Sequence, residues 1–161
     1  MKKVIFAVLV VFAVVKVKGQ DRAAEMEKVL AARPWMNRQV TSGGIRLEMR
    51  GIYVDSGLLW ISLRAVNGAA IDFRSGGMRF SIRYRHGMRR RAEQETRLVC
   101  VVRREPAILR SDSTEALCYG LAPRVPGKSR QLVVQWVERN GDRRLVLRVS
   151  GKNVLQAKRL E

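Results

Sequence analysis

The chain has 161 residues, and its 32 lysine and arginine residues outnumber 14 acidic residues to give a formal charge of +18. This length suits one domain, because two separate cores of the same total size would bury too little apolar surface. Apolar residues make up 47% and charged residues 29%, which indicates a folded protein and excludes a disordered polyelectrolyte or a membrane bundle. The single histidine, His86, disfavours histidine-rich metal sites and Ser-His-Asp catalysis, so we expect no enzyme, metal or cofactor.

The first nineteen residues predict a secretory signal peptide. Lys2 and Lys3 precede twelve uncharged apolar residues, 4–15. At about 1.5 Å per residue this run is too short for a bilayer core of roughly 30 Å. Residues 17–19 fit a cleavage site before Gln20, with an uncleaved membrane anchor as the alternative. Cleavage removes four lysines and leaves a mature exported chain at +14.

Residues 20–43 predict a short helix followed by a linker. The helix is expected over residues 22–33 because alanine and Glu-Lys spacing favours it, and Pro34 ends it. This segment holds few large apolar residues, so we expect it to lie outside the core.

From residue 44 to residue 161 the alternation of apolar and polar residues predicts β-strands. We expect strands at residues 45–50, 58–66, 80–84, 132–137, 145–149 and 154–158, with turns at 43–44, 55–57, 67–68, 76–77 and 140–141. The Asn140-Gly141 dipeptide favours a two-residue hairpin turn. We expect the hairpin to share one buried face formed by Leu132, Val134, Trp136, Leu145, Leu147 and Val149. Strands at this spacing without a helical crossover predict an all-β fold, an immunoglobulin-like antiparallel β-sandwich with a short N-terminal helix.

The two cysteines lie in runs that both resemble strands. If these runs pair antiparallel about residue 109, Cys100 falls opposite Cys118, and an oxidising compartment allows a disulfide between them. Two buried free thiols are the alternative.

Arginine is concentrated at one place, in residues 83–91. A partner-binding surface is expected there, formed by five side chains: Arg83, Arg85, Arg89, Arg90 and Arg91. Guanidinium groups suit bidentate contacts to carboxylate or phosphate, so the expected partner is anionic. A solvated hairpin tip balanced by Glu93, Glu95 and a partner is the alternative.

Six segments in order carry a family resemblance. They are Gly51–Asp55, Gly57–Trp60, Met78–Arg83, Arg89–Glu95, Val137–Gly141 and Val154–Leu160. Together these segments resemble the C-terminal region of the TraN family of Bacteroides-type conjugative transposons, over about residues 44–160.

The resemblance implies a structural component of a conjugative transfer apparatus, a type IV secretion channel. It implies a periplasmic location near the outer membrane and other channel subunits as partners. DNA or anionic lipid at the arginine run is the alternative partner, and a freestanding exported polyanion- or DNA-binding module is the alternative function. No small-molecule substrate is expected.

Overall fold

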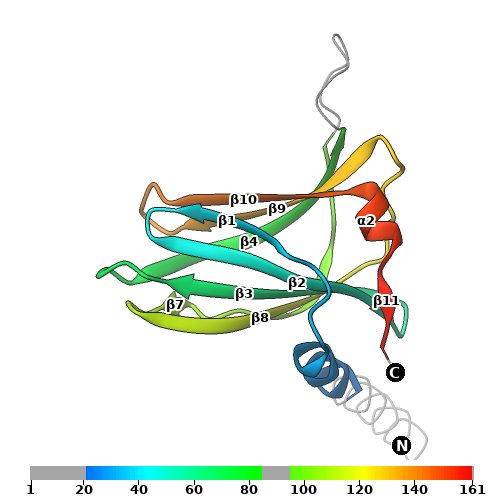
Figure 1. Cartoon of the computed structure of the whole chain (residues 1–161), viewed down its shortest axis with the longest axis horizontal. Helices are drawn as coiled ribbons and strands as arrows, with labels where there is room; N and C mark the ends of the chain where they lie inside the picture. The colour runs from blue at the N-terminus through cyan, green and yellow to red at the C-terminus, as the bar shows by residue number, and fades with distance from the viewer. Residues whose placement is uncertain (1–20, 85–94, 161) are drawn as a thin grey trace, which may run out of the picture.

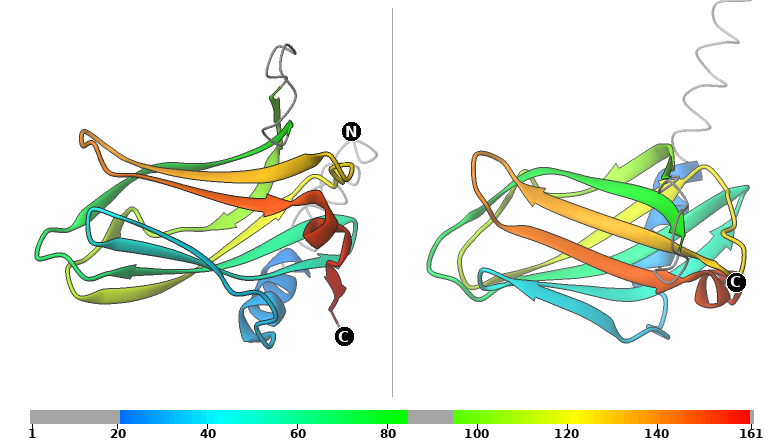
Figure 2. Two further views of the ribbon diagram at one scale, coloured as in Figure 1. Left: turned by 45° about the horizontal axis from the view of Figure 1, so that its top comes forward. Right: turned by 90° about the horizontal axis from the view of Figure 1, so that it is seen from above.

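The computed structural model describes residues 21–84 and 95–160, which form two β-sheets packed face to face (Figure 1). One sheet has the order β1-β2-β3-β8-β6, formed by Arg38–Ser42, Ile45–Asp55, Leu58–Asn67, Ser113–Leu121 and Cys100–Arg104. The other has the order β10-β9-β4-β5, formed by Arg144–Ser150, Arg130–Glu138, Phe73–Tyr84 and Thr96–Arg97. Two short strands complete them: β7 (Ile108–Leu109) pairs with β4, and β11 (Lys158–Arg159) pairs with β2 in parallel. The antiparallel β-sandwich expected from the sequence is confirmed, and Figure 2 shows its two layers.

The main core lies between the sheets and follows the predicted alternation. Ile45, Leu47 and Met49 of β2 are buried, and the intervening polar residues are half-exposed. In the β9-β10 hairpin, the register pairs buried residues of the two strands: Leu145 with Trp136, Leu147 with Val134, and Val149 with Leu132. The shared buried face predicted for this hairpin is therefore confirmed.

The hairpin turns at the predicted dipeptide but through a longer loop than expected. Asn140 has a φ of 57°, which is the left-handed conformation that asparagine tolerates. β9 ends at Glu138 and β10 begins at Arg144, so five residues connect the strands where the sequence predicted two. The turn at residues 55–57 matches its prediction, since β2 ends at Asp55 and β3 begins at Leu58.

The N-terminal segment contributes to the fold, against our expectation. Residues 21–31 are helical and bury Met26 and Val29 against the outer face of β2 and β3, in a second apolar cluster with Tyr53 and Trp60. Two well-spaced apolar side chains are enough to hold the helix on the sheet, because this sheet is hydrophobic on both faces. The expected linker is also wrong in part, since β1 occupies residues 38–42 and pairs with β2.

Two further predictions need correction. Residues 76–77 form no chain-reversing turn: they lie within β4, where the pairing with β9 shifts register between Ser75 and Met78. The strand expected at residues 154–158 is replaced by the helix α2 (Gly151–Leu155), because the Ser150 side chain accepts a hydrogen bond from the Asn153 amide at 3.3 Å and caps that helix.

Candidate binding site

Only Arg83 of the predicted arginine surface lies within the described residues; Arg85, Arg89, Arg90 and Arg91 lie outside them. Arg83 forms an ion pair with Glu95 at 2.8 Å. Hydrogen bonding from Ser81 and then from Arg83 holds the pKa of Glu95 below its ordinary value. The charge of Arg83 is therefore balanced within the chain, as the hairpin-tip alternative requires of this residue.

The two cysteines are both free thiols in the structure, which forms no disulfide between them. Strands β6 and β8 do pair antiparallel, but Cys100 lies opposite Leu121 and Cys118 lies opposite Arg104. A register shift between Cys100 and Val102 accompanies this pairing. Cys118 is buried beneath the N-terminal helix, and burial raises its pKa to about 12, whereas Cys100 is exposed.

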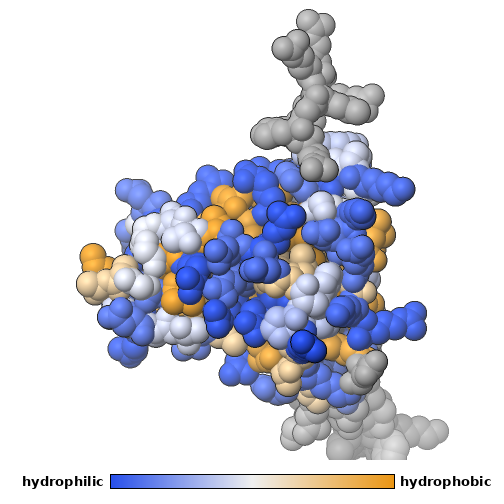
Figure 3. Space-filling model, in the orientation of Figure 1, coloured by the Kyte–Doolittle hydropathy of each residue, from blue (hydrophilic) through white to orange (hydrophobic). Residues whose placement is uncertain are grey.

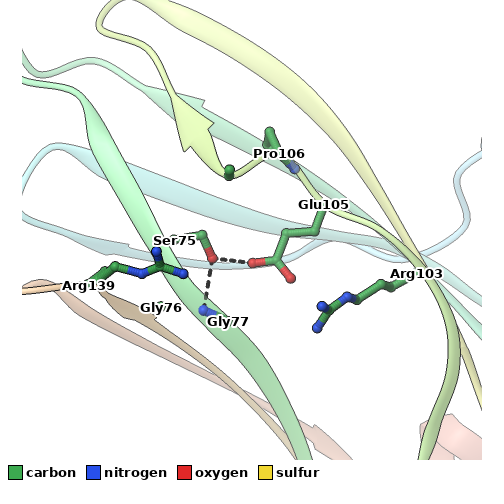
Figure 4. Close-up of a pocket in the computed structure, with 8 residues that line it drawn as sticks. Ser75, Gly76, Gly77, Arg103, Glu105, Pro106 and Arg139 are labelled. Atoms are coloured by element: carbon green, nitrogen blue, oxygen red, sulfur yellow. Dashed lines mark hydrogen bonds between the residues drawn. The ribbon is translucent and has the colours of Figure 1, made fainter.

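A cavity of the described chain lies where one segment leaves the edge of β4. Residues 96–97 and 108–109 both pair with β4, while residues 100–104 between them pair with β8 in the other sheet. This detour opens a cavity of about 260 Å³ beside the β4 bulge (Figure 4). Eight residues line it: Ser75, Gly76, Gly77, Arg103, Glu105, Pro106, Ala107 and Arg139.

The bulge depends on two glycines for different reasons. A Cβ at Gly76 would lie 3.1 Å from the Val137 carbonyl oxygen, so the neighbouring strand would have to move by a few tenths of an ångström to admit a side chain. Gly77 has a φ of 98° and faces open space, so its constraint is conformational. Together they let β4 bend away from β9 and leave space in front of Ser75.

A polar network fixes the inner wall of the cavity. The buried Trp136 indole donates to Ser75 Oγ at 2.8 Å and to Glu105 Oε1 at 2.9 Å. Ser75 Oγ also accepts from the Gly77 amide at 3.0 Å and donates to the same Glu105 oxygen. One carboxylate oxygen is therefore held by two donors, which fixes the direction of the Glu105 side chain.

A tyrosine hydroxyl lies behind this carboxylate. Tyr119 is buried, and its hydroxyl has no hydrogen-bond partner among the described residues. Burial first, and then the nearby Glu105 carboxylate, raise the pKa of Tyr119. The phenol therefore stays protonated at neutral pH.

Two guanidinium groups flank the fixed carboxylate. Figure 4 shows Arg139 on one side of Glu105 and Arg103 on the other, both drawn beside the cavity. Among the described residues, neither arginine forms an ion pair with a carboxylate. The cavity therefore combines one acceptor whose direction is set with two cations available to a ligand.

None of the cavity residues was predicted as a site from the sequence. Ser75 and Glu105 are separated by thirty residues and meet only because the chain detours between the sheets. The paired glycines 76–77 were the available signal, since a glycine pair inside a strand indicates a bulge. Within the described residues, no group of three or more histidine, cysteine or acidic side chains is placed to hold a metal ion.

The fold and this cavity define a small all-β sandwich whose chain is strongly basic. The face drawn in Figure 3 is mostly hydrophilic with scattered apolar patches. The chain belongs to the family described as "domain of unknown function (DUF4138)", whose model matches residues 19–159. No curated protein and no solved structure matches the chain. None of the helices in the described ranges 21–84 and 95–160 has the length and apolar character to cross a membrane.

Proposed function

We propose that the protein is a non-catalytic, exported assembly component of a conjugative transfer apparatus, located in the periplasm near the outer membrane. The resemblance of residues 44–160 to the TraN family supports the apparatus. The predicted signal peptide supports the compartment. The exposed edge of one sheet supports a role in binding other proteins.

One observation carries the binding role, namely the exposed edge at β6. This strand is the last of its sheet, and edge strands carry backbone groups that another chain can pair with. Val99, which precedes it, is 66% exposed, and Val101 within it is 39% exposed. Arg103 and Arg104 follow on the same strand and are exposed. A mixed apolar and cationic edge suits a protein partner, whereas a nucleic acid would use the cations alone.

Substitution of the two edge valines tests this proposal. Val99→Ser together with Val101→Ser should reduce co-purification of channel subunits from cells that carry the parent element, and should lower transfer frequency. The matched control is Val54→Ser with Val125→Ser, because these valines are 41% and 58% exposed elsewhere on the surface. Equal co-purification by both double variants would contradict a role for the edge.

The arginine run provides a second test. The second variant replaces Arg89, Arg90 and Arg91 by serine, which removes three guanidinium groups from the predicted partner-binding surface. The proposal expects loss of subunit co-purification from this variant. Loss of DNA binding with assembly intact would favour the alternative, a freestanding polyanion-binding module, whose affinity would also fall steeply with added salt.

A further inference from the structure

The cavity beside β4 is too small for a typical cofactor and is built to recognise two kinds of group at once. Its volume is about 260 Å³, below the roughly 300–1,000 Å³ of pockets that enclose drug-sized ligands. This space fits one side chain and the peptide group beside it. Arg103 and Arg139 offer guanidinium donors to an anion. Glu105 offers an acceptor to a donor group.

Glu105 decides which anion fits. Its Oε1 atom is held by Ser75 and Trp136, and no donor among the described residues is bonded to Oε2. An ionised carboxylate only accepts hydrogen bonds, so a ligand that satisfies it must bring an N–H or O–H group. A phosphodiester has no such donor and would leave Oε2 without a hydrogen bond. A peptide with an acidic side chain supplies both an anion and backbone N–H groups.

We infer that the cavity lined by Arg103, Glu105 and Arg139 binds an acidic segment of a partner protein. The partner's Asp or Glu carboxylate bonds to the guanidinium groups, and a backbone N–H of the same segment donates to Glu105 Oε2. Arg103 belongs to β6, so a chain that follows the exposed edge of that strand reaches the cavity. This inference rests on the proposed function and adds to it the chemical class of the partner.

The Trp136 indole provides a local probe for the test, because its N–H donates to the carboxylate that the ligand would engage. The mature chain labelled with 15N is titrated with the peptide acetyl-Val-Glu-Val-Asp-Val-amide. Saturable shifts are expected for the Trp136 indole and the Gly77 amide. The indoles of Trp35 and Trp60 should not move. The matched ligand control is acetyl-Val-Gln-Val-Asn-Val-amide, and a ten-nucleotide oligo-dT represents the phosphodiester.

Three variants assign the contacts. Arg103→Gln or Arg139→Gln should weaken binding of the acidic peptide by about tenfold or more, the effect of one charge-assisted hydrogen bond. Arg148→Gln is the matched control, since Arg148 is an exposed arginine on β10 away from the cavity, and it should bind like the unchanged protein. Glu105→Gln should increase binding of oligo-dT relative to the acidic peptide, because the peptide loses a charge-assisted hydrogen bond to the carboxylate and the phosphodiester has no such bond to lose.

The outcomes separate this inference from the proposed function. Equal binding of the amide peptide, stronger binding of oligo-dT at the cavity of the unchanged protein, or no loss with Arg103→Gln and Arg139→Gln would overturn the inference. Absent peptide binding with intact co-purification of channel subunits would overturn it while leaving the proposed function in place. Cavity binding of the acidic peptide, with no channel subunit in the co-purified material, would support the inference and contradict the proposed function.

Discussion

Replacement of Trp136 tests the core and the cavity wall in one experiment. The side chain is fully buried, and its ring lies 4.4 Å from the ring of Phe73. Trp136→Ala should therefore cost about 3–5 kcal/mol, the range for truncation of a large buried aromatic residue. For a domain of this size the melting temperature should fall by roughly 10–15 °C. Urea unfolding followed by far-UV circular dichroism measures the change through the midpoint, provided that the slope is unaltered.

A milder pair of variants measures how much of this loss of stability comes from hydrogen bonds. Trp136→Phe keeps most of the ring packing but removes the N–H that reaches Ser75 and Glu105, so about 1–2 kcal/mol should be lost. Combined with Ser75→Ala in a double-mutant cycle, the two changes should show a coupling of at least about 0.5 kcal/mol, because the residues share one network. Strictly additive effects, or an unchanged midpoint for Trp136→Ala, would refute this placement of β9.

Three other predictions concern the contacts or the exposure of individual side chains. Asn67→Ala should destabilise by about 2–4 kcal/mol in urea unfolding, since its buried amide donates to the carbonyls of residues 71 and 109 at 3.0 and 3.1 Å and accepts from the amide of residue 69 at 2.9 Å. Hydrogen bonding from Arg143 holds the pKa of Glu138 below its ordinary 4.5, so the carboxylate stabilises the fold while ionised. The stability difference between the unchanged protein and Glu138→Gln should be present above about pH 4.5 and vanish as the pH falls through the lowered value, as acid-range unfolding curves would show; a pH-independent difference would contradict this. In the native protein, iodoacetamide should label exposed Cys100 but not buried Cys118, and mass spectrometry should detect Cys118 labelling only after unfolding. An unlabelled protein with a mass two hydrogens lower, restored to the full mass by a reducing agent, would instead indicate the disulfide.

The strands that could be predicted from the sequence are those in which apolar and polar residues alternate, because this alternation decides which face is buried. In β2 and β10, each apolar residue of the predicted pattern is buried and each intervening residue is at least partly exposed over 45–50 and 144–149. The hairpin register follows from the same rule, because a slip of one residue would expose Leu145 and Leu147 and bury Val146 and Arg148.

The sequence did not predict the elements that depend on interactions other than this alternation. β1 has a largely polar sequence, Arg38–Ser42, and forms because β2 presents a free edge to it. α2 spans five residues, too few for a helical period to be visible, and depends on the Ser150 cap. The β6-β8 register could not be read from cysteine spacing, because Cys118 pairs with Arg104 and the irregularity after Cys100 changes the register by only one residue.

The cavity shows why composition alone could not specify a binding site in this protein. A charge of +18 predicts attraction to any polyanion and does not distinguish a nucleic acid from an acidic protein. The distinction comes from Glu105, one of only 14 acidic residues, which is held beside two arginines by a tryptophan from the opposite sheet. A surface selected only to bind phosphate would gain affinity by losing this carboxylate. Its fixed position therefore favours a ligand that carries hydrogen-bond donors as well as negative charge.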